Sequence, residues 1–173
     1  MSVPDALLGQ REIATVADME QLGREIGAGL VAGDVVVLTG PLGAGKTTLT
    51  RGIAAGLGVR GPIQSPTFVI ARTHPSLTGG PPLVHVDAYR LGSAAELDDL
   101  DIDLARSVVI VEWGRDVAAT IADRWWEIEL DREWRGGELP GAGRGELSGA
   151  EASELDADTP RLVTIARRSG SAD

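Results

Sequence analysis

A glycine-rich segment from Gly40 to Thr47 contains the residues with the clearest chemical potential, because it fits the spacing G-x-x-x-x-G-K-[ST] at every fixed position. Gly43 and Gly45 allow the backbone to turn so that successive N–H groups point at an anion. Lys46 can reach the β- and γ-phosphates of a nucleotide, and the Thr47 hydroxyl is a natural magnesium ligand. The pattern predicts a phosphate-binding loop.

The segments on either side of this loop are those that its chemistry requires. Residues 35–39 are apolar and mostly β-branched, which predicts a buried strand. After the loop, Leu49, Ile53 and Leu57 recur four residues apart, which predicts a helix whose N-terminus faces the anion. Lys46 is also the only lysine, against fifteen arginines, and this favours a selected phosphate contact over a chance match.

Composition limits the classes of function. A length of 173 residues favours one domain. The absence of cysteine excludes disulfides and thiol chemistry. Sixteen basic against 26 acidic residues give a net charge of −10, which disfavours tight, direct binding of nucleic acid. The chain has neither an apolar run of membrane-spanning length nor a signal pattern, so we expect a cytoplasmic protein without membrane contact.

Periodicity predicts alternating helices and strands in the rest of the chain. Thr15 and Asp18 form a capping box that opens a first helix, which either walls the nucleotide base or simply packs on the sheet. Further strands are expected at 68–72, 83–87, 107–112, 125–130 and 162–166, and short helices at 93–100 and 116–122. The first two of these strands should form an antiparallel hairpin or lie side by side.

Three segments are expected to lack regular structure. Residues 1–10 should be a mobile lead-in, and residues 168–173 a mobile tail. Residues 136–158 hold six acidic residues against one arginine and show no convincing period, so we expect a disordered or loosely ordered insertion.

Two of the predicted strands end in a carboxylate, Asp87 and Glu112. Open α/β sheets bind ligands at the carboxyl ends of their strands, so either residue could hold magnesium or position an attacking water. Thr67 could reach the γ-phosphate as a switch residue, although threonine is also common in strands. Trp113 would either pack over the site or belong to the core.

Several other classes of site are disfavoured. The chain has no asparagine, which excludes an N-K-x-D guanine-recognition motif and leaves adenine nucleotides as the default. The protein-kinase signature set is absent as well. His74 and His85 have no partner at a metal-binding spacing, so we interpret both as structural.

Five motifs, in order within residues 13–130, resemble the TsaE family, the small ATPases of bacterial tRNA threonylcarbamoyladenosine synthesis. They are GPLGAGKTTLTRG at 40–52, SPTF at 65–68, HVDAYRL at 85–91, EL at 96–97 and VEW at 111–113. The resemblance implies an α/β fold of the P-loop NTPase type, with a mixed β-sheet flanked by helices in a single domain. It implies a magnesium-dependent ATPase, slow without partners, that acts as the energy-coupling subunit of a threonylcarbamoyl-transfer complex. The partners would be proteins of the TsaB and TsaD type, and tRNA would be contacted only through that complex.

The resemblance also implies roles for individual residues. Thr47 and Glu112 would be the magnesium ligands, and Lys46, Thr67, Asp87 and Glu112 the catalytic residues, with the choice between Asp87 and Glu112 as activator of the water left open. ATP would be bound by Thr15, Leu42, Gly43, Ala44, Gly45, Lys46, Thr47, Thr48, Trp113 and Arg161. The chain departs from the family at Gly114 and Arg115, where proline and glutamate are common.

Two other functions remain open from the residues alone. In a small-metabolite kinase, Asp87 would activate an acceptor hydroxyl and residues 136–158 would be a lid, but such a lid needs phosphate-binding arginines and this segment has one. In a non-catalytic, nucleotide-dependent interaction module, the variant Glu112→Gln would retain full biological activity.

Overall fold

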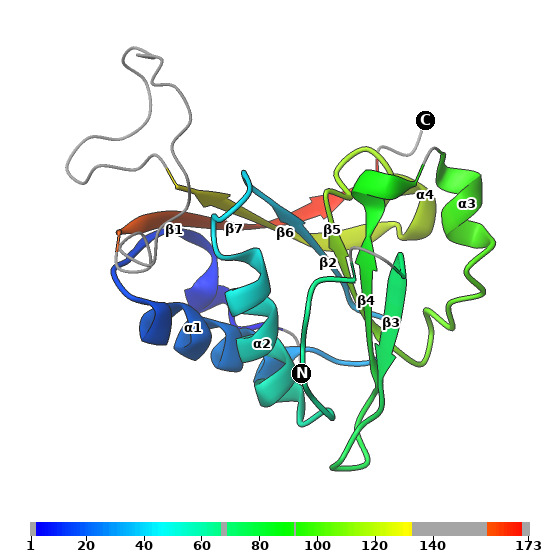
Figure 1. Cartoon of the computed structure of the whole chain (residues 1–173), viewed down its shortest axis with the longest axis horizontal. Helices are drawn as coiled ribbons and strands as arrows, with labels where there is room; N and C mark the ends of the chain where they lie inside the picture. The colour runs from blue at the N-terminus through cyan, green and yellow to red at the C-terminus, as the bar shows by residue number, and fades with distance from the viewer. Residues whose placement is uncertain (1–2, 67–68, 92, 133–158, 171–173) are drawn as a thin grey trace.

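The computed structural model describes residues 3–66, 69–91, 93–132 and 159–170, which form a seven-stranded mixed sheet with helices on both faces (Figure 1). The predicted α/β fold with a mixed sheet is confirmed. The strands are β1 (Gly9–Ile13), β2 (Val35–Thr39), β3 (Ala71–His74), β4 (Leu83–Asp87), β5 (Val108–Glu112), β6 (Arg124–Asp131) and β7 (Arg161–Ser169). The helices are α1 (Val16–Gly29), α2 (Lys46–Leu57), α3 (Ala94–Asp98) and α4 (Ala118–Ile121), with 3-10 turns η1 (Asp5–Leu7) and η2 (Ala88–Arg90).

The strand order, β1-β7-β6-β2-β5-β4-β3, places β2 at the centre of the sheet. Strand β2 pairs in parallel with β5 on one side and with β6 on the other, and β4 pairs in parallel with β5. The outer pairings, β1 with β7, β7 with β6 and β3 with β4, are antiparallel. The carboxyl ends of β2, β4 and β5 therefore meet at one edge of the sheet, where the chain turns from β2 toward α2.

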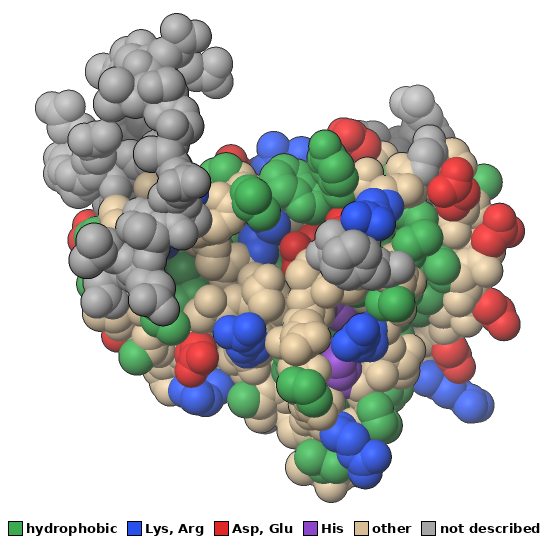
Figure 2. Space-filling model, viewed as in Figure 1, with side chains coloured by type: hydrophobic (Ala, Val, Ile, Leu, Met, Phe, Trp, Pro, Cys, Tyr) green, Lys and Arg blue, Asp and Glu red, His purple; other side chains and the backbone are tan. Residues whose placement is uncertain are grey.

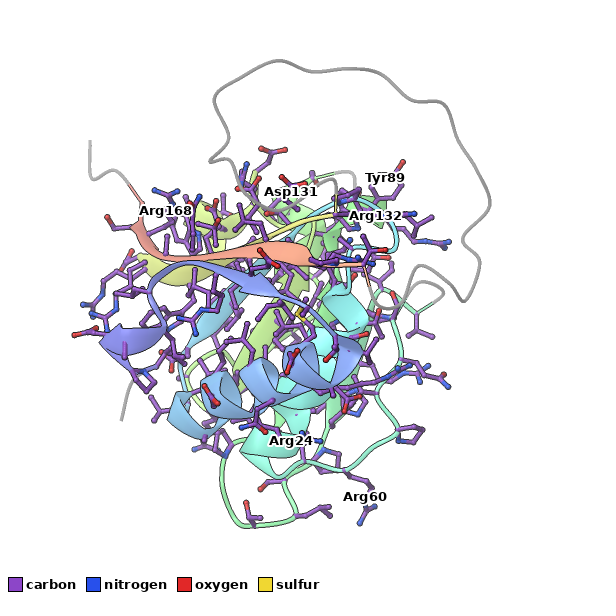
Figure 3. All side chains as sticks on the ribbon, turned by 90° about the vertical axis from the view of Figure 1, so that its left-hand side faces the viewer. Arg24, Arg60, Tyr89, Asp131, Arg132 and Arg168 are labelled. Atoms are coloured by element: carbon purple, nitrogen blue, oxygen red, sulfur yellow. The ribbon has the colours of Figure 1, made fainter. Side chains whose placement is uncertain are left out.

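The sheet separates two apolar cores. Alternation along β2 sends Val36 and Leu38 to the side covered by α1 and α2, and Val35 and Val37 to the side covered by α3 and α4. Because both faces of β2 are covered, its sequence is a continuous apolar run rather than an alternation of apolar and polar residues. Figure 3 shows side chains filling the space between the sheet and helices α1 and α2.

Helices α1 and α2 approach each other through glycine, backbone against backbone. A Cβ added at Gly23 of α1 would lie 2.5 Å from the carbonyl oxygen of Leu49 in α2, and one at Gly27 would overlap the carbonyl oxygen of Ile53. On α2, a Cβ at Gly52 would overlap the carbonyl oxygen of Glu20. This contact fixes the N-terminus of α1 beside the phosphate-binding loop that begins α2.

The two chain ends differ from the expectation of a mobile lead-in and tail. Residues of the lead-in form η1 and the start of β1, which pairs with β7 at the edge of the sheet. Strand β1 escaped prediction because only Ile13 among its residues is buried, so apolar alternation is missing. Strand β7 runs to Ser169 and includes the first residues of the predicted tail. The predicted insertion at 136–158 and residues 171–173 lie outside the described residues.

The predicted hairpin is confirmed as β3 and β4, but its first strand begins at Ala71 rather than at residue 68. The N–H groups of Val69 and Ile70 both donate to the carbonyl oxygen of Pro66, at 3.0 and 2.9 Å. Ile70 also has a φ of 64°, which extended strands do not adopt. The turn made by these residues delays the strand.

We predict that Gly27→Ala lowers the free energy of unfolding by about 2 kcal/mol, because the added methyl group meets rigid backbone and forces the helices apart. The better helix propensity of alanine offsets about 1 kcal/mol of a larger gross effect. Urea unfolding followed by circular dichroism measures the change. Gly80→Ala, where a Cβ meets only ordinary contacts, is the matched control and should change stability by less than about 0.5 kcal/mol. Equal effects of the two substitutions would contradict the tight contact.

Candidate functional site

The phosphate-binding loop lies between the end of β2 and the start of α2. Gly43 and Gly45 have φ values of 76° and 106°, a region that favours glycine, as the predicted turn requires. Gly45 is the N-cap of α2, so the unpaired N–H groups of the first helical turn open toward the loop. Thr47 and Thr48 lie in that first turn.

Lys46 projects back into this loop. Its Nζ donates to the carbonyl oxygens of Gly40 and Pro41, at 2.7 and 3.0 Å. Burial lowers the pKa of Lys46, whereas the negative charges of Glu112 and Asp87 act in the opposite direction. The ammonium group is thus already desolvated and directed at the loop, where phosphate oxygens can replace the two carbonyl oxygens as charge-assisted acceptors.

Asp87 and Glu112 are brought together by the parallel pairing of β4 and β5, in which they are direct partners in register. Both are almost fully buried, at 6% and 4% exposure. Oε1 of Glu112 lies 2.8 Å from Nε2 of His85, and Oδ1 of Asp87 accepts a hydrogen bond from the backbone N–H of Tyr89. In the pairing of β2 with β5, Glu112 is also the partner of Leu38, two residues before the loop.

Trp113 connects the carboxylate edge to the lysine. Its φ of 61° turns the chain out of β5 immediately after Glu112, and its N–H donates to the carbonyl oxygen of Leu38 at 3.0 Å. The indole ring lies 4.3 Å from Nζ of Lys46, a cation–π geometry. Of the two predicted roles for this residue, the structure supports packing over the site, because the side chain is 39% exposed rather than in the core.

Apolar side chains surround the mouth of this edge. Leu42 is 86% exposed and Tyr89 is 77% exposed, and the Tyr89 ring lies 5.8 Å from that of Trp113. The space-filling view shows hydrophobic side chains on this face beside basic and acidic ones (Figure 2). The charged groups of the site are therefore bordered by exposed apolar surface rather than by a uniformly polar one.

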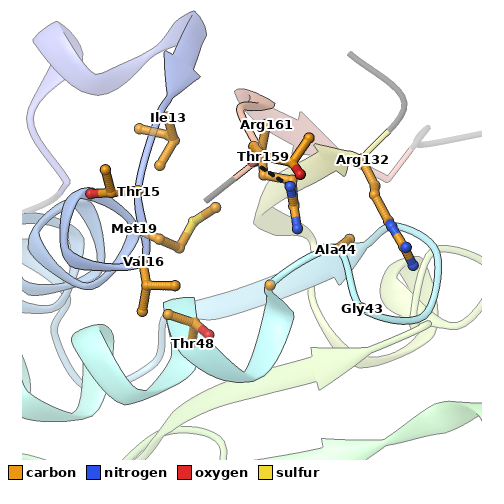
Figure 4. A pocket seen from close by; sticks show the side chains of 11 residues that line it. Ile13, Thr15, Val16, Met19, Gly43, Ala44, Thr48, Arg132, Thr159 and Arg161 are labelled. Atoms are coloured by element: carbon orange, nitrogen blue, oxygen red, sulfur yellow. Dashed lines mark hydrogen bonds between the residues drawn. The ribbon is translucent and has the colours of Figure 1, made fainter. Parts of the chain in front are cut away.

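A cavity of about 210 Å³ lies next to the loop, between the start of α1 and the start of β7 (Figure 4). Its wall on the α1 side is mostly apolar, and the other side carries arginines, which suits a planar base joined to a charged phosphate chain. The lining residues are Ile13, Thr15, Val16, Met19, Gly43, Ala44, Gly45, Thr48, Arg132, Thr159 and Arg161.

Six of the predicted nucleotide-binding residues line this cavity from three separate parts of the chain: Thr15, then Gly43, Ala44, Gly45 and Thr48, and finally Arg161. Thr15 caps α1 by accepting a hydrogen bond from the N–H of Asp18 at 3.1 Å, which confirms the predicted capping box. Residues at the start of α1 line the cavity, and the helix also packs in the core beneath the sheet, as one of the two alternatives predicted; a contact with the nucleotide base stays a prediction. Arg161 donates to the carbonyl oxygen of Thr159 (Figure 4).

The sequence alone did not predict that Arg132 lies at the site, and it led to the interpretation of His85 as structural although His85 contacts Glu112. Arg132 follows β6 and donates from Nη1 to the carbonyl oxygen of Leu42 at 3.2 Å, 90 residues away in sequence. No local pattern indicates that contact. A signal for His85 did exist, because it precedes Asp87 by two residues in a strand and must share its face of the sheet. Thr67, the predicted switch residue, lies outside the described residues.

The departure from the family at Arg115 has a structural counterpart. Its guanidinium group lies 2.7 Å from Glu127 and 3.2 Å from Glu129, two carboxylates of β6. It also lies 3.4 Å from the hydroxyl of Thr39, the last residue of β2. Arg115 thus connects the turn after Glu112 and Trp113 to the central strands. In this chain the turn is held by that arginine, without the proline and glutamate that are common at these positions in the family.

The residues at the carboxyl edge fit a magnesium ion that arrives with a nucleotide. Carboxylate and hydroxyl oxygens, the ligands that magnesium prefers, are supplied by Glu112, Asp87 and Thr47. Within the described ranges, no group of three His, Asp or Glu side chains could hold a metal on its own.

Comparisons with known proteins identify the family of this chain. Residues 13–138 match the family described as threonylcarbamoyl adenosine biosynthesis protein TsaE. The tRNA threonylcarbamoyladenosine biosynthesis protein TsaE of Streptomyces coelicolor is 57% identical over 117 residues, covering 66% of this chain and 79% of the relative. The Mycobacterium tuberculosis protein of the same name is 51% identical over 133 residues, covering 72% and 79%.

A solved structure gives the same answer for the fold. The crystal structure of Bacillus subtilis YdiB aligns with a TM-score of 0.61 at 25% identity, covering 90% of this chain and 82% of that one. The resemblance seen in the motifs is therefore confirmed over most of the chain. This chain belongs to the TsaE family of tRNA threonylcarbamoyladenosine biosynthesis proteins.

Proposed function

We propose that this member of the family is a magnesium-dependent ATPase that drives threonylcarbamoyladenosine formation as the energy-coupling subunit of a complex with TsaB- and TsaD-type proteins. The observation that carries the ATPase activity is the convergence of one buried lysine, held in a phosphate-binding loop, with two buried carboxylates in register on adjacent parallel strands. Phosphoryl transfer needs these three charges at one edge, and a structural role alone does not.

Each group has a defined task in this proposal. The loop N–H groups and Lys46 bind the β- and γ-phosphates, and Lys46 exchanges its two carbonyl acceptors for phosphate oxygens. Thr47 and Glu112 would hold the magnesium ion, which would supply positive charge against the charge that develops on the transferred phosphoryl group. Asp87 and Glu112 orient the attacking water by accepting its hydrogen bonds. Thr15, Thr48 and Arg161 border the cavity for the adenine base and ribose.

Charge and surface support the partner assignment. A chain with a net charge of −10 repels the tRNA backbone, so tRNA would be held by the partner proteins. The exposed Leu42, Tyr89 and Trp113 at the mouth of the site would let a partner sense the nucleotide. In the described part of the chain, no helix has the length and apolarity needed to cross a membrane, and we propose that the protein works in the cytoplasm.

We predict that Lys46→Ala lowers the rate of magnesium-dependent ATP hydrolysis at least about 100-fold, because the developing phosphate charge loses its cation. Phosphate release is measured with and without the TsaB- and TsaD-type proteins. The wild-type protein should be slow alone and faster with the partners. Lack of any response to the partners would contradict the coupling role. Transfer of the γ-phosphoryl group of ATP to an added metabolite would support a kinase instead.

We predict that Glu112→Gln lowers kcat by about 100-fold or more while the affinity for ATP falls much less, because a neutral amide can neither bind magnesium strongly nor polarise the water. Nucleotide affinity is measured by calorimetry and turnover by phosphate release. The matched control is Glu129→Gln. Glu129 is exposed, pairs with Arg115 and lies on the face of the sheet opposite to that of Glu112. Full activity of Glu112→Gln would favour the non-catalytic interaction module.

We predict that ATP binding changes the tryptophan fluorescence of the protein, because phosphate charge arrives at Lys46, whose Nζ lies 4.3 Å from the Trp113 ring. The chain has four tryptophans, so the assignment needs a subtraction. Trp113→Phe should abolish the nucleotide-dependent change while leaving the remaining emission intact. A change that persists in Trp113→Phe would place the signal at another tryptophan.

A further inference from the structure

His85 is a fully buried polar residue that the proposed mechanism has not yet used. It lies in the middle of β4, and its Nε2 is 2.8 Å from Oε1 of Glu112, whose side chain is 6% exposed. The two residues are 27 positions apart in sequence and meet because β4 and β5 pair in parallel. Among the described residues, His85 is the hydrogen-bond partner of the Glu112 carboxylate.

The ring of His85 can serve Glu112 in one tautomer only. An ionised carboxylate accepts hydrogen bonds and cannot donate them, so Nε2 must carry the proton. The other ring nitrogen, Nδ1, is buried without a partner in the described part of the chain. Since Nδ1 has no partner with or without a proton, the bond to Glu112 is the interaction that places a proton on Nε2.

Geometry gives this bond a directional consequence. A glutamate side chain has three rotatable bonds, and burial limits the rotamers of Glu112 without deciding which neighbour each carboxylate oxygen faces. The bond at Oε1 selects one orientation, in which the carboxylate stays beside Asp87 and close enough to Lys46 to act on its pKa. Without it, a buried carboxylate with no hydrogen bond would turn toward solvent or toward the lysine.

We propose that His85 is a positioning residue for nucleotide hydrolysis: its Nε2–H holds the Glu112 carboxylate at Oε1, in the orientation from which Oε2 would serve the magnesium ion and the attacking water. This inference rests on the proposed function, because it assumes that Glu112 takes part in turnover. Partners of this kind around metal-binding or catalytic carboxylates change activity or metal affinity by about 10- to 100-fold when removed.

The decisive experiment compares His85→Leu with His85→Gln in the full-length protein with its partner proteins. His85→Leu should lower kcat for ATP hydrolysis by about 10- to 100-fold, with the KM for ATP changed by less than about twofold. His85→Gln places an amide N–H near the position of Nε2 and should recover most of the lost kcat. Loss of kcat without rescue by Gln would overturn the positioning role.

His74→Leu is the matched control for loss of a buried imidazole. His74 lies on the neighbouring strand β3, is also buried, and bonds to the carbonyl oxygen of Arg60 rather than to a carboxylate of the site. Its substitution should lower the melting temperature but not kcat. If His74→Leu and His85→Leu reduce kcat equally, the effect of His85 is structural and the proposal fails.

A spectroscopic measurement tests the bond without relying on turnover. Long-range ¹H–¹⁵N correlation of the imidazole rings should show His85 as the Nε2–H tautomer at neutral pH, and the Nδ1–H tautomer would overturn the inference. The failures are also distinguishable. A wild-type protein that hydrolyses no ATP with its partners would refute the proposed function, whereas an active wild type with an equally active His85→Leu would refute this inference alone.

Discussion

The close contact between α1 and α2 is the constraint on which the site depends. Gly23 faces Gly52 and Gly27 faces the backbone of Ile53 with no room for a side chain, so the helices touch through backbone atoms and their relative position is fixed. Helix α2 carries the phosphate-binding loop at its N-terminus, and α1 carries Thr15 at its own. The glycines thereby decide the width of the cavity between them, although none contributes a functional group to it.

The second determinant of the site is the balance of charge at the carboxyl edge of the sheet. A lysine and two carboxylates are buried there, and each would be unfavourable alone. Burial lowers the pKa of Lys46, and the negative charges of Glu112 and Asp87 counter this, so the two carboxylates favour the charged form of the lysine. A site assembled in this way presents preorganised charges to a phosphate chain and needs little rearrangement to bind it.

The same edge joins rigid and accessible parts of the molecule. Strands β2 and β5 are buried on both faces and hold Glu112 beside Leu38, two residues before the loop, whereas Trp113 turns outward immediately after Glu112. Arg115 then ties this turn to β6 across the opposite face of the sheet. A change in the position of Lys46 would reach the exposed aromatic surface through a single ring contact, a short path from nucleotide to partner.

The sequence alone determined the phosphate-binding loop, its flanking strand and helix, and the two strand-end carboxylates, because motif spacing and hydrophobic periodicity are local properties. It also indicated the family, since the ordered motifs span most of the chain. Only the tertiary structure decided what meets what: that Asp87 and Glu112 are partners in register, that His85 holds Glu112, and that Arg132 reaches the loop. Those contacts depend on strand order and parallel pairing, which no local pattern encodes. Strand β1 was missed for the same reason: only one of its residues is buried, and the strand is recognised by its pairing with β7 rather than by a local pattern.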